Sequence, residues 1–220
     1  AMQRVLVTGG SRGLGKAAVD EFKRRGWDVV SPSRAELNLA SGDSIRNYCE
    51  GLAATGRLDA LVHSAGVNWP RPLEQTSEDE WQLTLQVNLT AFRQMVQLLA
   101  PLLARGRVVA LGSILGVVAR PNRAAYSASK AGLLGVVRAL ALDLANQETL
   151  INAVCPGYVD TDMTRQNNSE EQLAEIAKSI PLGRLGLPEE ISKLVVWLCS
   201  LENTYITGQG VLIDGGFTCH

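Results

Sequence analysis

A tyrosine and a lysine four residues apart are the side chains of this sequence best suited to move a proton. Tyr126 and Lys130 belong to the run YSASK, and side chains at this spacing share one face of a helix. A tyrosine hydroxyl with its ordinary pKa of about 10 is a poor base at neutral pH. A nearby lysine ammonium stabilises the phenolate and lowers that pKa. The pair therefore predicts acid–base chemistry.

A glycine-rich turn provides a second chemical signal. The run TGGSRGLG at 8–15 follows an apolar segment at 4–8 and opens a helical pattern. Gly9, Gly13 and Gly15 allow a tight turn and a close approach of the backbone to a ligand. The N-terminus of the following helix offers unpaired N–H groups and a positive dipole end to phosphate. This strand–turn–helix context predicts a nucleotide site.

The elements that must position these residues alternate between short β-branched runs and longer helical patterns. Strands are expected at 4–8, 28–31, 60–63, 107–111, 150–155 and 210–213, and helices at 13–25, 77–103, 124–146 and 188–199. This alternation predicts a mostly parallel sheet with helices on both faces. The sequence shows no linker, so we expect one domain over 1–220. A polar excursion at 157–187 follows a strand end, where a substrate lid is expected.

Composition narrows the class of protein. The 220 residues are 46% hydrophobic and 20% charged with a net charge of −1, which indicates a globular chain and no nucleic-acid or membrane partner. The sequence lacks a secretory leader pattern, and we expect a cytoplasmic protein with four free thiols. No metal site and no Ser-His-Asp hydrolase is expected, because the only histidines are His63 and His220 and no GxSxG run occurs.

The order and spacing of the motifs resemble the short-chain dehydrogenase/reductase family over nearly the whole chain. Besides the glycine turn and the Tyr126–Lys130 pair, the matching positions are Asn88 within Val87-Asn88-Leu89, Ser113 at a strand end 13 residues before Tyr126, Pro156-Gly157 followed by Thr161, the run 207–210 and Asp214-Gly215-Gly216. The runs at 162–165 and 181–186 are similar to those of the 3-oxoacyl-(acyl carrier protein) reductases within this family.

The resemblance implies a doubly wound α/β Rossmann-type domain with seven parallel strands in the order 3-2-1-4-5-6-7. Only a few residues separate Ser33 from Leu37-Asn38-Leu39, which resembles the third strand, so the helix between strands 2 and 3 is expected to be missing. Asn38 stands where the family often has an aspartate that faces the adenine amino group. His63 departs from the family's Asn-Asn-Ala-Gly run and is expected to be structural.

The family mechanism implies a role for each matching residue. Tyr126 would exchange a proton with the substrate oxygen, while Lys130 would hold the nicotinamide ribose hydroxyls and tune Tyr126. Ser113 would hydrogen-bond the substrate carbonyl, and Asn88 would hold a water that links Lys130 to solvent. The cofactor-binding residues that the resemblance implies are Gly9, Ser11, Arg12, Gly13, Leu14, Gly15, Ser33, Arg34, Asn38, Leu39, Ala65, Gly66, Tyr126, Lys130, Pro156, Gly157, Val159 and Thr161.

The cofactor is expected to be NADP(H) rather than NAD(H). In this family an acidic residue at the end of the second strand accepts the ribose hydroxyls of NAD, and Ser33 occupies that position. No carboxylate is expected there to repel a 2′-phosphate. Arg34, together with Arg12 in the glycine turn, could form charge-assisted bonds to that phosphate.

The expected reaction interconverts a carbonyl and a secondary alcohol, with a 3-oxoacyl thioester on a carrier protein or coenzyme A as the leading substrate. One alternative is a sugar, polyol or secondary-alcohol dehydrogenase of the same family. Another is a non-catalytic dinucleotide-sensing regulator, but the presence of Tyr126 and Lys130 disfavours the regulator. Arg105 and Arg165 are expected near the mouth of the site, where an acidic acyl carrier protein could dock. Apolar residues on more than one stripe of the helices at 77–103 and 124–146 predict a homo-oligomer, a tetramer or dimer.

Overall fold

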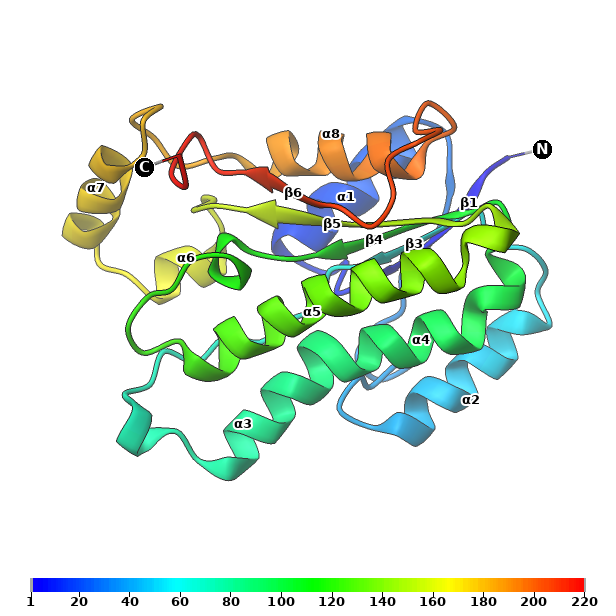
Figure 1. Ribbon diagram of the computed structural model, residues 1–220, viewed down its shortest axis with the longest axis horizontal. Helices are drawn as coiled ribbons and strands as arrows, with labels where there is room; N and C mark the ends of the chain where they lie inside the picture. Colours follow the sequence, from blue (N-terminus) through cyan, green and yellow to red (C-terminus); the bar gives the residue numbers. More distant parts are fainter. Residues whose placement is uncertain (1, 220) are drawn as a thin grey trace.

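Parallel strands form the sheet that carries the site. The computed structural model describes residues 2–219, and within them the strands are β1 (Arg4–Thr8), β2 (Asp28–Val30), β3 (Ala60–His63), β4 (Arg107–Leu111), β5 (Leu150–Pro156) and β6 (Gly210–Ile213). They lie in the order β2-β1-β3-β4-β5-β6, and every neighbouring pair is parallel. The predicted α/β class with a parallel sheet is confirmed (Figure 1).

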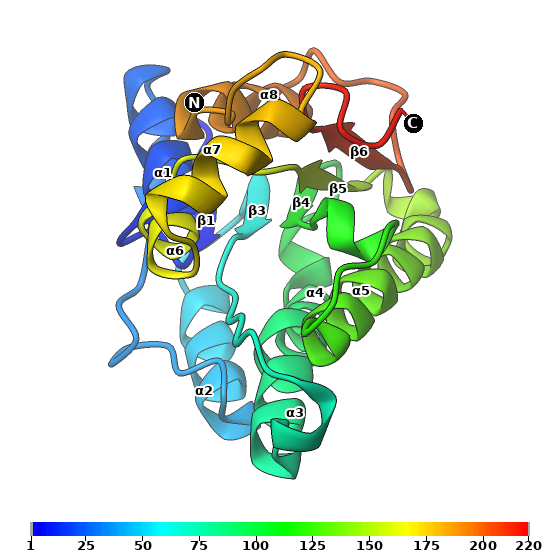
Figure 2. The same ribbon diagram turned by 90° about the vertical axis from the view of Figure 1, so that its left-hand side faces the viewer.

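Helices cover both faces of this sheet (Figure 2). The helices are α1 (Gly13–Arg24), α2 (Gly42–Ala53), α3 (Glu78–Leu85), α4 (Ala91–Leu99), α5 (Ala124–Asp143), α6 (Asp162–Gln166), α7 (Glu170–Ser179) and α8 (Pro188–Cys199). On one face α1 packs beside α8, and on the other lie α2, α4 and α5. Helices α6 and α7 lie beyond the carboxyl ends of the strands, within the predicted 157–187 excursion (Figure 1).

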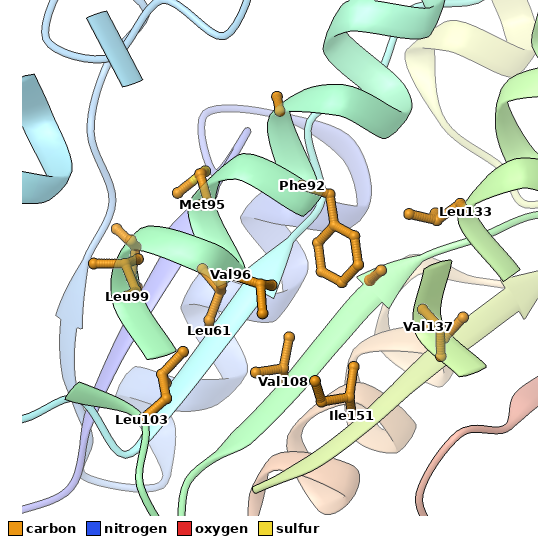
Figure 3. Packing of buried hydrophobic residues seen from close by; sticks show 14 of the residues in the cluster. Leu61, Phe92, Met95, Val96, Leu99, Leu103, Val108, Leu133, Val137 and Ile151 are labelled. Carbon is orange, nitrogen blue, oxygen red and sulfur yellow. The ribbon is translucent and has the colours of Figure 1, made fainter. Parts of the chain in front are cut away.

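The buried faces follow from the alternation of side chains along each strand. Leu61, Val108 and Ile151 point to the layer of α4 and α5, where they pack with Phe92 and Leu133 (Figure 3). Residues at the alternate positions of the same strands, such as Val62, Val109 and Val154, point to the layer of α1 and α8. Because both faces are covered, the central strands β1, β3, β4 and β5 are largely apolar, as buried parallel strands usually are.

The predicted third strand at Leu37–Leu39 is wrong, and the sheet has six strands rather than seven within residues 2–219. After β2 the chain makes one turn, in which the Leu37 amide donates to the Ser33 carbonyl oxygen at 3.0 Å. As expected, no helix follows β2 before this segment. A parallel strand needs a crossover of about a dozen residues or more. The same shortening that removes the helix therefore removes the strand, and the sheet ends at β2.

Two helical segments differ from the sequence-based expectation. Helix α2 was not expected, although Ser41 caps it by accepting from the Ser44 amide and Ile45, Cys49 and Leu52 form its buried stripe. The long helix expected at 77–103 is formed by α3 and α4 with a π-helical turn between them, Gln86–Thr90. Such turns insert one extra residue into a helix and occur often at functional sites.

Candidate active site

A cavity of about 640 Å³ opens at the carboxyl ends of β1, β3 and β4. In open parallel sheets this is the edge where ligands bind. The residues implied for the cofactor that line it are Gly9, Ser11, Arg12, Gly13, Leu14, Gly15, Ser33, Arg34, Asn38, Leu39, Ala65, Gly66, Tyr126, Lys130 and Thr161. The structure therefore gathers the glycine turn, the end of β2 and the tyrosine–lysine pair around one space.

The glycine turn is packed so tightly that side chains would not fit. A Cβ atom on Gly15 would lie 2.1 Å from the Gly9 carbonyl oxygen, and one on Gly9 would lie 2.7 Å from the backbone of Ala65. Gly9 and Gly13 also have positive φ angles of 69° and 55°. These contacts place the turn directly against the loop after β3, so the two segments form adjoining parts of the cavity wall.

The N-terminus of α1 faces this cavity without a side-chain cap. Its N-cap residue, Arg12, is extended with φ −154° and forms no capping hydrogen bond, and the first turn holds no acidic residue. Unpaired N–H groups and the positive end of the helix dipole are thus left for a ligand. This arrangement, together with the glycine cradle, fits the pyrophosphate of a dinucleotide.

Tyr126 and Lys130 lie in the first two turns of α5. The Lys130 side chain is buried, and its Nζ donates to the Leu111 carbonyl oxygen at 2.6 Å. The same Nζ lies 5.6 Å from the centre of the Tyr126 ring. Burial lowers the pKa of Lys130 to about 8. The lysine is therefore fixed at the end of β4, with its ammonium group beside the tyrosine ring.

The pKa of Tyr126 differs from the sequence-based expectation. Burial raises it above its ordinary value, while the Ser113 hydroxyl and then the Arg123 charge lower it in part. In the protein without ligands the net direction is thus upward, opposite to the lowering expected from the lysine, and Tyr126 is a protonated hydroxyl at neutral pH.

Ser113 lies two residues beyond β4 and opens a short 3₁₀ turn, Ile114–Gly116. Its Oγ accepts from the Leu115 amide at 3.1 Å. Together with Tyr126 it lines a second cavity of about 150 Å³, which adjoins the larger one. The remaining residues implied for the cofactor line this smaller cavity: Pro156, Gly157 and Val159, with Thr161 shared by both.

Asn88 sits in the π-helical turn and is fully buried. Its Oδ1 accepts from the Val67 amide at 2.8 Å, and its Nδ2 donates to the Val67 carbonyl and to Ser129 Oγ. Ser129 Oγ in turn donates to the Tyr126 carbonyl at 2.7 Å. Asn88 lines neither cavity. Its side chain ties the loop after β3 to the turn of α5 that carries Tyr126.

His63 at the end of β3 has both ring nitrogens paired. Nε2 lies 3.2 Å from the Val87 carbonyl oxygen, to which it donates, so Nδ1 accepts from the Thr8 hydroxyl at 3.2 Å. Burial, and then the Lys130 charge, lower its pKa to about 4. A neutral, fully bonded imidazole joins β1, β3 and the π-helical turn, which agrees with a structural residue.

Two features of the expected site need correction. A carboxylate does lie at the end of β2, because Glu36 Oε2 accepts from the Ser33 amide at 2.7 Å. The position of Glu36, three residues after Ser33 and across a turn, is the feature of the sequence that could have indicated this carboxylate. Arg105 precedes β4 and pairs with Glu148, so it lies at the opposite end of that strand from the site. Arg165 lies near the site but pairs with Asp160 at 2.7 Å.

Five further residues that line the two cavities were not predicted from the sequence. Arg120, Arg123 and Asn68 line the smaller cavity, and Trp69 and Met163 line the larger one. Only the position of Arg123, three residues before Tyr126 and directly before α5, could have suggested it.

Comparisons with known proteins agree with this geometry. A family model described as enoyl-(acyl carrier protein) reductase matches residues 34–218. The 3-oxoacyl-(acyl carrier protein) reductase of Vibrio cholerae is 34% identical, covering 96% of this chain and 95% of its own length. The acetoacetyl-CoA reductase of Shinella zoogloeoides is 36% identical, covering 98% of each chain.

Solved structures give the same result. A putative NAD(P)-dependent gluconate 5-dehydrogenase from Beutenbergia cavernae, with NADP bound at low occupancy, has a TM-score of 0.91 and 32% identity over 100% of this chain and 98% of its own. A short-chain dehydrogenase family protein from Francisella tularensis has a TM-score of 0.91 and 27% identity over 100% of both. With the Rossmann-type sheet, the glycine turn and the tyrosine–lysine pair in place, these matches show that the chain is an oxidoreductase of the short-chain dehydrogenase/reductase family.

Proposed function

We propose that this protein reduces a carbonyl to a secondary alcohol, or catalyses the reverse reaction, with NADP(H). The observation that carries the proposal is that Tyr126 and Lys130 line the same cavity as the uncapped N-terminus of α1. A proton donor and a phosphate site therefore face one space. The bound dinucleotide would supply or accept the hydride.

The chain's own residues would act on the substrate oxygen. The Tyr126 hydroxyl, kept protonated by burial, donates its proton to the developing alkoxide. Ser113 hydrogen-bonds the same oxygen and orients the carbonyl. Lys130, held by the Leu111 carbonyl, presents its charge to the ribose and to the tyrosinate that remains. Asn88 positions Tyr126 through Ser129.

The preference for NADP(H) is proposed from the residues after β2. Arg34 and Arg12 line the large cavity, and neither forms an ion pair with an acidic side chain of residues 2–219. Both are thus available to a 2′-phosphate. Glu36 is expected to weaken this preference. Its carboxylate accepts from the Ser33 amide and so places a negative charge in the same turn, where it would repel a 2′-phosphate. The preference for NADPH should accordingly be real but incomplete.

The proposed substrate class is a 3-oxoacyl thioester. Support comes from the relatives, which include reductases of 3-oxoacyl-(acyl carrier protein) and of acetoacetyl-CoA. The segment at 157–187 is proposed to be the substrate lid, because Thr161 and Met163 at its start line both cavities. Arg165 and Arg105 are both in ion pairs and lie far apart in the fold, so they give no support to a carrier-docking surface.

The test is NADPH oxidation at 340 nm, on the scale of minutes, with a panel of carbonyl compounds. Acetoacetyl-CoA, a carrier-linked 3-oxoacyl group, a keto sugar acid and a simple ketone cover the candidate classes. Turnover of the thioesters above the others supports the proposal. If only the sugar acid is turned over, the protein is a sugar dehydrogenase instead. The absence of any turnover, with the dinucleotide bound, would leave a binding protein instead of an enzyme.

A further inference from the structure

Two arginines without an acidic partner lie in the smaller cavity beside Tyr126. Arg120 and Arg123 line it together with Ser113 and Tyr126. Among residues 2–219 neither guanidinium forms an ion pair, whereas the surface residues Arg165 and Arg184 do. Two like charges in one small space repel each other, so their placement together points to an anion that binds between them.

Arg123 is the more deeply buried of the pair, at 9% exposed. The structure gives its guanidinium one hydrogen bond, from Nη1 to the carbonyl of the adjacent Asn122 at 3.2 Å. A guanidinium has five N–H donors in a planar fork. Burial, and then the Arg120 charge, lower its pKa. Its remaining donors are thus available to a ligand at a site that disfavours an uncompensated cation.

Arg120 is held in position by an aromatic side chain. Its Nη1 donates to the Tyr158 hydroxyl at 3.1 Å, and its guanidinium carbon lies 5.6 Å from the centre of that ring. The Tyr158 ring in turn packs edge-on against Phe217, with 5.4 Å between centroids. A guanidinium fixed in this way loses little freedom when it binds a carboxylate.

A third side chain also lacks a partner in this cavity. Asn68 Oδ1 is buried and forms no hydrogen bond with the described part of the chain. Buried polar atoms in folded proteins are almost always paired. A primary amide can turn over to present its NH₂ instead, so Asn68 can serve either an anion or a hydroxyl on the same ligand.

The size of the cavity limits what it can hold. Its volume of about 150 Å³ is below the roughly 300–1,000 Å³ of pockets for drug-sized ligands. A group of a few heavy atoms fits, whereas a long acyl chain does not. The cavity is therefore suited by its size to a short end of a substrate, and Arg120, Arg123 and Asn68 favour a polar one.

We propose that Arg120 and Arg123 bind a carboxylate that the substrate carries close to its reactive carbonyl. The inference rests on the proposed function, because Tyr126 and Ser113 must face that carbonyl. Two sources share this chemistry: a free short oxo acid and a short 3-oxoacyl thioester whose acyl end bears a carboxylate. A planar carboxylate matches the guanidinium fork through two parallel hydrogen bonds.

The experiment compares matched substrates that differ in one charge. Acetoacetate is compared with methyl acetoacetate, and the monothioester of 3-oxoglutarate with the acetoacetyl thioester. The variants are Arg120→Gln and Arg123→Gln, with Arg123→Lys to keep the charge and Arg46→Gln, an exposed arginine on α2, as the control. In a second arm, the rise in Tm that acetoacetate produces without cofactor is measured for each protein.

The carboxylated partner of at least one pair should show a kcat/KM at least about tenfold higher in the wild type, the scale of one charge-assisted hydrogen bond. Each glutamine variant should abolish that advantage through KM and lose the Tm rise. Arg120→Gln should leave the kcat/KM of the neutral partner within about threefold. Arg123→Lys should retain part of the preference, and Arg46→Gln all of it. The pair with the larger ratio identifies the source of the carboxylate.

Equal use of the charged and neutral partners by the wild type, or equal losses on both in Arg120→Gln, would overturn the inference. Turnover of the neutral thioester would still uphold the proposed function. If no carbonyl compound is reduced, the proposed function fails and the Tm arm decides the inference alone. A Tm rise that Arg123→Gln removes supports it, and no rise in the wild type refutes it.

Discussion

The Glu36 carboxylate accepts a hydrogen bond from the Ser33 amide at 2.7 Å and closes the turn at the end of β2. That bond lowers the pKa of Glu36, so the group is ionised at neutral pH. Arg34 lies within the same turn and lines the large cavity. The turn at which a ribose phosphate is proposed to bind therefore carries both a cation, Arg34, and an anion, Glu36.

The first prediction concerns the effect of these two charges on the choice between NADPH and NADH. Arg34→Ala should weaken NADPH binding by about tenfold and leave NADH binding almost unchanged, since a charge-assisted hydrogen bond is worth roughly 1.5–3 kcal/mol. Glu36→Gln should strengthen NADPH binding a few-fold, because a like charge is removed from an exposed, screened site. Titration of nucleotide fluorescence measures both. An unchanged NADPH/NADH ratio in both variants would remove these residues from cofactor selection.

Tyr126→Phe deletes the hydroxyl and keeps the ring. Turnover should fall at least about a hundredfold, the usual scale for acid–base catalysis, while the dissociation constant of the dinucleotide stays within a few-fold. Tyr205→Phe is the matched control, because Tyr205 is 95% exposed and lines neither cavity. Steady-state kinetics on the best substrate of the panel gives the answer. Activity within a few-fold of the wild type would exclude Tyr126 as the proton donor.

The buried imidazole of His63 predicts a pH dependence of stability. Its pKa is depressed to about 4 in the fold, from 6.5. Below pH 6.5 the His63 imidazole binds a proton in the unfolded chain but stays neutral in the folded chain. The free energy of unfolding therefore falls on acidification. Between pH 6.5 and 5 the loss should be about 1.5 kcal/mol.

The measurement is urea unfolding at several pH values for the wild type and for His63→Asn. The asparagine variant should have the flatter profile over that window, because His220 is present in both proteins and cancels. Parallel profiles would show that His63 does not resist protonation.

Gly15→Ala and Gly51→Ala test the packing of the glycine turn. A methyl group at Gly15 meets the Gly9 carbonyl oxygen at 2.1 Å, whereas one at Gly51, inside α2, has nothing within 4 Å. The first change should lower the free energy of unfolding by at least about 2 kcal/mol and abolish dinucleotide binding. The second should raise it by roughly 0.5–1 kcal/mol, the helix preference of alanine over glycine. Equal effects of the two changes would argue against the tight turn.

Apolar runs bounded by turn residues located the strands well, because both faces of a parallel sheet are buried. The segment at 37–39 misled the sequence reasoning, since Leu37 and Leu39 are buried without being paired in the sheet. Burial alone does not make a strand when the chain is too short to cross over. Glu36 was missed for a related reason: its carboxylate reaches the Ser33 amide only through the turn that the shortening creates.

The site likewise has a part that local motifs predict and a part that depends on contacts between distant segments. Local motifs placed Gly9, Gly15, Tyr126 and Lys130 around one cavity, because each motif fixes its own turn or helix end. The pairing of Arg120 with Tyr158 joins two segments 38 residues apart, and no local pattern encodes such a contact. The pKa of Tyr126 likewise depends on burial, which the spacing of a motif does not reveal.

The end of the sheet at β2 has a consequence for solubility during folding. An edge strand offers unpaired N–H and C=O groups on which another chain can add a strand, so long edges invite aggregation. β2 is three residues long and ends at Val30, and the second residue after it is Pro32, which has no N–H to donate. The edge left by the missing strand is thus too short to act as a template, and the loss of one strand does not turn the sheet into a seed for intermolecular growth.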